Sequence, residues 1–194
     1  MTRSARTGGR PRSVLAPIIL SAILAAAGRG AAQSLPGEAP HPEEFHCPPP
    51  PPDRPDFTEA LAWIDFPRFG LFVPVYEGVE ESTLRRGAGH VPGTSLPGAR
   101  DDYRNCVIAA HRTTYFSPLE SVGKGDVFSV ITPAGVEEYV VDRTLVVTPR
   151  HVELEEPTPE KRVTLVTCTP FNYLGSAPRR LVVLASLRDG STGK

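Results

Sequence analysis

The sequence predicts a mainly β protein, a single closed β-barrel with short helices in its connecting loops. Short runs rich in Val, Ile, Leu, Tyr and Phe follow one another from about residue 56, and Gly or Pro separates them. None of these runs shows sustained helical periodicity, and short strands with frequent turn signals are typical of barrels. At 194 residues the chain is long enough for one ordinary domain with extra segments, but too short for two.

Residues 1–32 have the pattern of an export signal. An arginine-rich start precedes an apolar stretch from Val14 to Ala27, and small residues follow at Gly30-Ala31-Ala32. The apolar stretch covers 14 residues, which is short against the roughly 20 that span a bilayer. We therefore expect either a cleaved signal peptide or an uncleaved N-terminal membrane anchor, with the rest of the chain exported.

Residues 33–56 are expected to form a linker. The segment is rich in Pro, Gly and Glu, and Pro48–Pro52 is a run of five prolines. Such a run favours the extended polyproline helix, which suits a semi-rigid spacer and also suits recognition by a proline-binding module. The globular domain is then expected at 57–189, with a short tail at 190–194.

The elements of the globular domain are assigned from its first residue onward. Phe57–Ile64 is compatible with a short helix, and further short helices are expected near Glu81–Arg86 and Ser117–Val122. Strands are expected at Phe69–Val75, Asn105–Ala110, Asp126–Ile131, Glu138–Val147, Arg162–Thr167 and Arg180–Leu187.

Charge and cysteine content narrow the classes of function. The net charge of −1 gives no general attraction to nucleic acid or to an anionic membrane. Cys47, Cys106 and Cys168 fit no zinc spacing and are too few for a disulfide scaffold. Because their number is odd, at least one thiol of an exported chain stays unpaired, and catalysis is one reason to keep it.

Three candidate site residues lie at the ends of predicted strands. Cys168 follows the run Arg162–Thr167, and Pro170 ends the strand soon afterwards because proline cannot continue a central strand. His111 directly ends an apolar run, and Arg180 begins the last one. A cysteine nucleophile needs an acid–base partner and a group that stabilises an oxyanion. Arginine suits only the second role, because its guanidinium is not deprotonated in proteins.

Each of these residues also has a purely structural explanation. Taken alone, a buried cysteine, a hydrogen-bonded histidine at a strand edge and a solvated arginine are the commoner situations. The remaining histidines are weaker candidates. His41 and His46 lie in the linker, and His90 and His151 lie in turn-like surroundings. The acidic cluster at residues 153–156 is interpreted as a solvated loop, not as a calcium site.

The order of these motifs resembles the sortase family. Thr164–Pro170 resembles the TLxTC active-site strand of that family, Arg180 follows Cys168 at the family's spacing, and Ile108–Arg112 resembles its histidine strand. The resemblance covers about Arg68 to Leu187.

The finer resemblance is to class D sortases, including proteobacterial members. It rests on blocks at Gly87–Thr94, Gly125-Asp126, Thr167–Phe171 and Gly175–Arg180. Each block is weak alone, and their joint occurrence in this order makes the resemblance specific.

The resemblance implies a cysteine transpeptidase on a sortase-type barrel, with Cys168 as nucleophile, His111 as acid and base, and Arg180 as hydrogen-bond donor to the substrate. It implies protein substrates with a C-terminal LPxTG-like sorting signal, cleaved through a thioester acyl-enzyme. The acceptor is then an amine of a cell-wall precursor or a pilin-like lysine.

Further implications concern the surroundings of this reaction. Four neighbours of the catalytic residues are expected to contact substrate: Ala110, Arg112, Thr167 and Pro170. Neither a cofactor nor a metal nor nucleic acid is implied. The expected location is the extracytoplasmic face of the cell envelope, with the protein membrane-anchored by its N-terminal segment or secreted into the periplasm.

The sequence departs from the family pattern at several positions. Ala110 precedes the histidine where Gly is usual, Thr113 replaces an acid, and Ala88 stands where Pro is common. Cys106 occupies a position usually held by an aliphatic residue, which leaves open a regulatory disulfide with Cys168.

Three other functions remain open at this point. A hydrolase that trims the same signals without transfer uses the same three residues, and an inactive member would bind without reacting. The third alternative is a structural envelope protein with a proline-rich stalk, but this function would not explain the sequence blocks around His111, Cys168 and Arg180. A papain-like protease is disfavoured, because in that family the cysteine precedes the histidine in the chain.

Overall fold

The structure is a computed structural model, and it describes residues 55–149, 152–188 and 190. The predicted signal or anchor segment, residues 33–54 of the linker, Cys47 and His151 lie outside the described residues, as does most of the tail. Within the described ranges, no helix is both long enough and apolar enough to cross a membrane.

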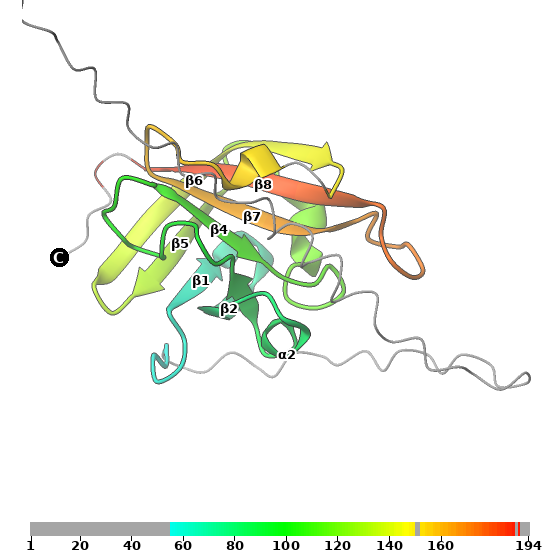
Figure 1. Cartoon of the computed structure of the whole chain (residues 1–194), viewed down its shortest axis with the longest axis horizontal. Helices are drawn as coiled ribbons and strands as arrows, with labels where there is room; N and C mark the ends of the chain where they lie inside the picture. Colours follow the sequence, from blue (N-terminus) through cyan, green and yellow to red (C-terminus); the bar gives the residue numbers. More distant parts are fainter. Residues whose placement is uncertain (1–54, 150–151, 189, 191–194) are drawn as a thin grey trace, which may run out of the picture.

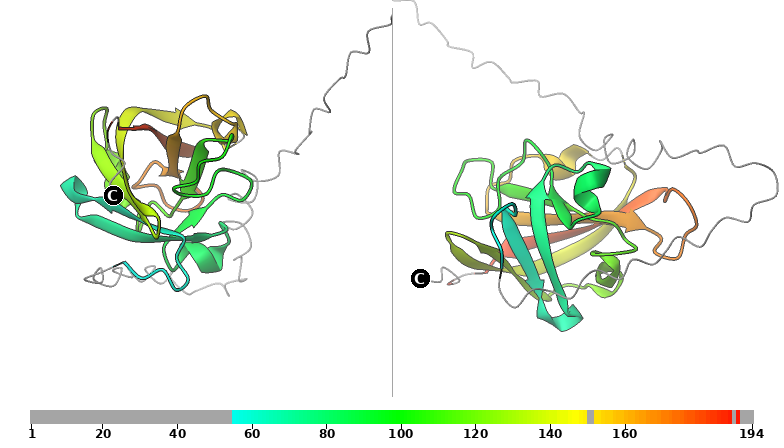
Figure 2. Two further views of the ribbon diagram at one scale, coloured as in Figure 1. Left: turned by 90° about the vertical axis from the view of Figure 1, so that its left-hand side faces the viewer. Right: turned by 90° about the horizontal axis from the view of Figure 1, so that it is seen from below.

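The described part of the chain forms one closed β-barrel, which confirms the predicted fold class (Figures 1 and 2). Its strands are β1 (Ala62–Phe66), β2 (Leu71–Glu77), β3 (Ala88–His90), β4 (Asn105–Ala109), β5 (Val127–Thr132), β6 (Gly135–Val147), β7 (Arg162–Thr169) and β8 (Arg179–Leu187). Their order around the barrel is β1-β2-β3-β4-β7-β8-β6-β5. The β2–β3 and β4–β7 pairs are parallel, and the other neighbours are antiparallel.

Helical segments are short and lie in the connecting loops. They are η1 (Pro67–Phe69), α2 (Glu81–Leu84), η2 (Ser117–Ser121) and η3 (Val152–Glu155). The helices expected near Glu81–Arg86 and Ser117–Val122 are confirmed as single short turns. None of these segments is long enough to be stable without the barrel.

The helix expected at Phe57–Ile64 is wrong, because β1 begins at Ala62 and residues 55–61 form no helix. Ala62, Ile64 and Phe66 have no exposed surface and alternate along the strand into the barrel interior. β1 pairs with β2 on one side and with β5 on the other. Tertiary pairing and burial therefore override a weak local helical tendency.

The short strand β3 is not expected from the sequence, because it lies in a glycine-rich segment without strand patterning. Gly89 explains the glycine content, since a Cβ at this position would collide with the carbonyl oxygen of Gly78. β3 pairs with β2 and with β4. The close approach that glycine permits therefore holds β3 against the end of β2, and β4 pairs with the other edge of β3.

The segment of sheet formed by β4, β7 and β8 is buried on both faces. The barrel interior contains, among others, Ile108, Leu165, Val183 and Ala185. A second apolar cluster, called here the outer cluster, covers the opposite face and comprises Val79, Val91, Val107, Ala109, Val166, Val182 and Leu184. Leu145, Val147 and Leu154 pack against it. Burial on both faces fixes the register of these three strands, because a one-residue slip would exchange the two sets.

Candidate active site

Strand register places the three candidate residues in one row across β4, β7 and β8. In the parallel β4–β7 pair, Ala109 lies opposite Val166 where β4 ends, and the Ala110 N–H still donates to the Val166 carbonyl. His111 and Cys168 each follow two residues beyond this pair. In the antiparallel β7–β8 pair, Cys168 lies directly opposite Arg180. The side-by-side arrangement of the three strands is visible in Figure 1.

The same register places these residues on one face of the sheet. Side chains two residues apart along a strand share a face. The residues two positions away from the candidates all belong to the outer cluster: Ala109, Val166 and Val182. His111, Cys168 and Arg180 therefore continue the outer apolar face at its end, and not the barrel interior.

A buried hydrogen bond joins the ends of β4 and β7. The Thr167 hydroxyl donates to the Ala110 carbonyl at 2.8 Å, and the Ala110 N–H donates to the Val166 carbonyl at 3.2 Å. Thr167 precedes Cys168 and Ala110 precedes His111, so these bonds fix the relative position of the two catalytic candidates. The predicted substrate contacts of Thr167 and Ala110 stay predictions.

Arg180 is buried, with 2% of its surface exposed. Its Nη1 donates to the carbonyls of Ala177 at 3.2 Å and Arg179 at 3.0 Å. Its Nε is buried and has no partner within the described residues. A solvated arginine is therefore the wrong interpretation here. An unpartnered buried donor costs about 1–3 kcal/mol, and beside Cys168 it is suited to a ligand.

Arg112, which follows His111 in the chain, connects this segment to the loop between β7 and β8, residues 170–178. Its Nη2 donates to the carbonyls of Tyr173 at 2.6 Å and Gly175 at 3.0 Å. Gly175 has φ 82°, a left-handed conformation that glycine adopts without strain. Pro170 begins this loop and is exposed. The predicted contacts of Arg112 and Pro170 with substrate stay predictions.

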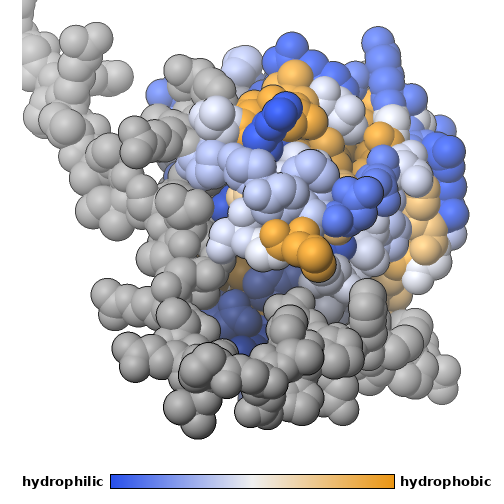
Figure 3. All heavy atoms as spheres, turned by 90° about the vertical axis from the view of Figure 1, so that its right-hand side faces the viewer, coloured by the Kyte–Doolittle hydropathy of each residue, from blue (hydrophilic) through white to orange (hydrophobic). Residues whose placement is uncertain are grey.

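The loop between β7 and β8 presents apolar groups to solvent. Leu174 is 95% exposed and Tyr173 is 46% exposed. Figure 3 shows this side of the molecule as hydrophilic surface mixed with several apolar patches. The tip of the loop is therefore held away from the core.

An acidic side chain that the sequence did not indicate lies beside His111. The Nε2 of His111, which is partly exposed, is 3.5 Å from Oε2 of Glu81 in α2. The other oxygen of Glu81 accepts from Nε of Arg85 at 3.0 Å. The sequence gives one indirect signal for this contact, which is that Thr113 stands where an acid is usual. That signal does not identify Glu81, because Glu81 lies in a different segment of the chain.

Cys106 is buried in β4, unpaired and remote from Cys168. Burial raises the pKa of the Cys106 thiol well above its ordinary value, so the thiol stays protonated and inert. Cys106 lies opposite Val163, which places Cys168 about 16 Å further along the strand at 3.3 Å per residue. A disulfide needs Cα atoms within about 7 Å, so a Cys106–Cys168 bridge does not fit this fold.

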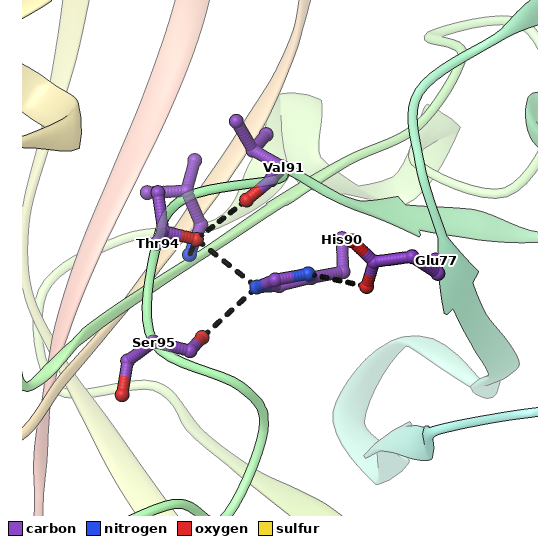
Figure 4. A network of polar contacts seen from close by, with 6 residues as sticks. Glu77, His90, Val91, Thr94 and Ser95 are labelled. Carbon is purple, nitrogen blue, oxygen red and sulfur yellow. Dashed lines mark hydrogen bonds and ion pairs between the residues drawn. The ribbon is translucent and has the colours of Figure 1, made fainter. Parts of the chain in front are cut away.

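His90 is a buried structural histidine. Its Nδ1 lies 2.8 Å from a Glu77 carboxylate oxygen, and its Nε2 lies 3.0 Å from the Ser95 carbonyl and 3.1 Å from the Thr94 hydroxyl (Figure 4). The Thr94 hydroxyl donates to the Val91 carbonyl at 2.8 Å. The expectation of turn-like surroundings is wrong, because His90 ends β3 with 2% of its surface exposed.

The described residues contain no group of three or more His, Cys, Asp or Glu side chains that could hold a metal ion. In the acidic segment, burial raises the pKa of the Glu155 carboxyl above its ordinary value. One of its oxygens has no hydrogen-bond partner in the described part of the chain. Glu155 is therefore partly buried, unlike the solvated loop expected from the sequence.

Comparison with known proteins identifies the family to which this fold belongs. The Sortase domain family matches residues 64–188. Sortase D of Bacillus subtilis (strain 168) is 28% identical over 131 residues, 67% of this chain and 65% of the relative. Sortase A of Streptococcus agalactiae serotype III (strain NEM316) is 31% identical over 137 residues, 66% of this chain and 53% of the relative.

Solved structures give the same result. Sortase C1 of GBS Pilus Island 1 aligns with a TM-score of 0.63 and 32% identity, over 70% of this chain and 68% of that one. Sortase C-1 from Actinomyces oris aligns with a TM-score of 0.62 and 33% identity, over 69% and 76%. The chain therefore belongs to the sortase family, and it resembles class D.

Proposed function

We propose that this chain is a cysteine transpeptidase that cleaves an LPxTG-like sorting signal and transfers the acyl part to an amine. Cys168 is the nucleophile, His111 the acid and base, and Arg180 the donor to the substrate oxygen. The observation that carries this proposal is the row of these three residues on one face of β4, β7 and β8.

The environment of each residue supports its role. Of the two cysteines in the described residues, Cys106 is buried and Cys168 is partly accessible, so among these two only Cys168 combines a thiol with access. His111 is also partly exposed and can exchange protons with an incoming or leaving amine. Arg180 lies opposite Cys168 in the strand register and keeps an Nε without a partner in the described residues, and a free donor of this kind can stabilise an oxyanion.

The reaction then has two steps. The Cys168 thiol gives its proton to His111, and its sulfur attacks the carbonyl carbon at the cleavage site. The C–N bond breaks, and His111 passes the proton to the leaving amine. An acceptor amine next attacks the thioester, the C–S bond breaks, and His111 takes the proton from that amine. Arg180 donates hydrogen bonds to the carbonyl oxygen while it carries negative charge in each step.

The cellular setting forms part of the same proposal. The substrates are proteins with a C-terminal sorting signal, and the acceptor is an amine of a cell-wall precursor or a pilin-like lysine. Pilus-associated sortases among the similar structures favour the second acceptor. The catalytic domain acts on the extracytoplasmic face of the cell envelope, with residues 1–32 as a signal peptide or membrane anchor and the proline-rich segment as its spacer.

The experiment that tests this proposal separates transfer from hydrolysis. The purified full chain is incubated with a quenched library of LPxTG-like peptides, with and without an added amine. Amine-joined product that depends on Cys168 supports the transpeptidase. Cleavage without any incorporation of the amine would instead support the hydrolase alternative, and neither product across the library would support an inactive, binding-only protein.

A further inference from the structure

Arg112 does more in this structure than follow the catalytic histidine in the chain. Both hydrogen bonds of its Nη2 end on backbone carbonyls of the loop between β7 and β8, at Tyr173 and Gly175. Charge-assisted bonds of this kind are about twice as strong as neutral ones. One side chain from the end of β4 therefore holds the turn of a loop that belongs to two other strands.

The same loop holds Arg180. The carbonyl of Ala177, two residues after Gly175, accepts from Nη1 of Arg180 at 3.2 Å. Ala177 is buried at 5% exposure, so the end of the loop packs against the barrel while its tip is exposed. A continuous set of contacts thus runs from Arg112 through the loop backbone to the guanidinium of Arg180.

We propose that Arg112 is a positioning residue that holds the guanidinium of Arg180 in place through the carbonyls of the loop between β7 and β8. The proposal rests on the proposed function, because it assumes that Arg180 donates to the substrate. Without Arg112, the loop before Ala177 loses two charge-assisted bonds, and only packing and the Arg179 carbonyl remain to orient the guanidinium of Arg180. Misplacement by about 1 Å lowers rates by up to about a hundredfold.

The test is a double-mutant cycle on the full chain, read as the rate of acyl-enzyme formation by mass spectrometry. The variants are Arg112→Ala, Arg112→Lys, Arg180→Lys and the double variant Arg112→Ala with Arg180→Lys. Arg188→Gln is the matched control. Arg188 is an exposed arginine just after β8, and it pairs with Glu138 away from His111, Cys168 and Arg180. We expect Arg112→Ala to lower kcat about tenfold with little change in KM, and Arg112→Lys to recover part of the loss.

The cycle distinguishes positioning from direct substrate contact. If Arg112 acts through Arg180, Arg112→Ala causes little further loss in the Arg180→Lys background. An equal loss in both backgrounds overturns the proposal, because Arg112 then acts without Arg180. If Arg180→Lys itself has no effect, the role of Arg180 in the proposed function fails instead.

Limited proteolysis gives a second measurement that does not depend on activity. Arg112→Ala should speed cleavage within residues 172–176, which are exposed, while Arg188→Gln leaves the cleavage rate unchanged. An unchanged cleavage rate in Arg112→Ala also overturns the proposal, because the loop is then held without Arg112.

Discussion

Cys168 and Arg180 are direct partners in the antiparallel pair of β7 and β8, so the strand register itself sets a thiol opposite a buried guanidinium. Opposed residues of such a pair have Cβ atoms about 4.5–5.5 Å apart. Because both strands are buried on two faces, the register cannot slip without exposing apolar side chains. The relationship is therefore set by the pairing of two barrel strands and not by a loop.

Replacing Arg180 should affect chemistry more than access to the thiol. We expect Arg180→Ala to lower the rate of acyl-enzyme formation about 10²–10³-fold, as for loss of an oxyanion donor. Alkylation of Cys168 by iodoacetamide should change little. The acylation rate of Arg180→Lys should lie between those of the unmodified chain and Arg180→Ala, since lysine keeps the charge but not the planar donor geometry. Equal loss of acylation and alkylation would indicate a collapsed site instead.

Glu81 should have a modest effect through His111. The pair is partly exposed, and exposed ion pairs contribute about 0–1 kcal/mol, so Glu81→Gln should lower kcat/KM about two- to fivefold. Steady-state kinetics with a peptide substrate measure this loss. Glu80→Gln is the matched control, since this neighbouring acid is exposed. A kcat/KM equal to that of the unmodified chain argues against any contact between Glu81 and His111 in solution.

His90→Ala should lower stability without touching the reacting groups. The change leaves the Ser95 carbonyl without its ring partner in a buried position, and we expect a loss of about 2 kcal/mol in the free energy of unfolding. Urea denaturation measures this loss. Glu77→Gln should cost less, because Glu77 is about half exposed. An unchanged midpoint for His90→Ala would show that the network does not contribute.

The stability of the barrel should fall as pH rises past the titration of Glu155. Burial raises the folded-state pKa of Glu155 above its ordinary value of 4.5. From about pH 4.5 upward the folded chain therefore keeps a proton that the unfolded chain releases, and this favours the unfolded state increasingly. Glu155→Gln stays neutral, so its Tm at pH 7 should exceed that of the unmodified chain and match it near pH 4.

The neighbouring acid provides the control for this prediction. Glu156 is exposed, and Glu156→Gln should leave the pH dependence of Tm unchanged. A pH dependence that persists in Glu155→Gln would show that another group causes it.

The three catalytic candidates could be predicted because each lies at the end of an apolar run that can be recognised from the local sequence. Cys168, His111 and Arg180 each adjoin an apolar run, and Pro170 marks where the strand must stop. The barrel could be predicted for the same reason, since short runs and turn residues are readable without knowledge of pairing.

What the sequence could not predict depends on tertiary contacts. β1 carries the alternation of Ala62, Ile64 and Phe66, but its identity as a strand is decided by pairing on both edges. Glu81 and Arg112 acquire their partners only when distant segments meet. The burial of Arg180 likewise depends on packing that no local pattern records.

The most direct measurement of the central claim is the intact mass of the full chain after reaction with an LPxTG-like peptide. The unmodified chain and Cys106→Ala should each gain the mass of one acyl fragment, and hydroxylamine should remove it because a thioester is labile to this nucleophile. Cys168→Ala should gain nothing. An adduct that persists in Cys168→Ala, or that disappears in Cys106→Ala while the protein stays folded, would contradict the assignment of Cys168 as the nucleophile.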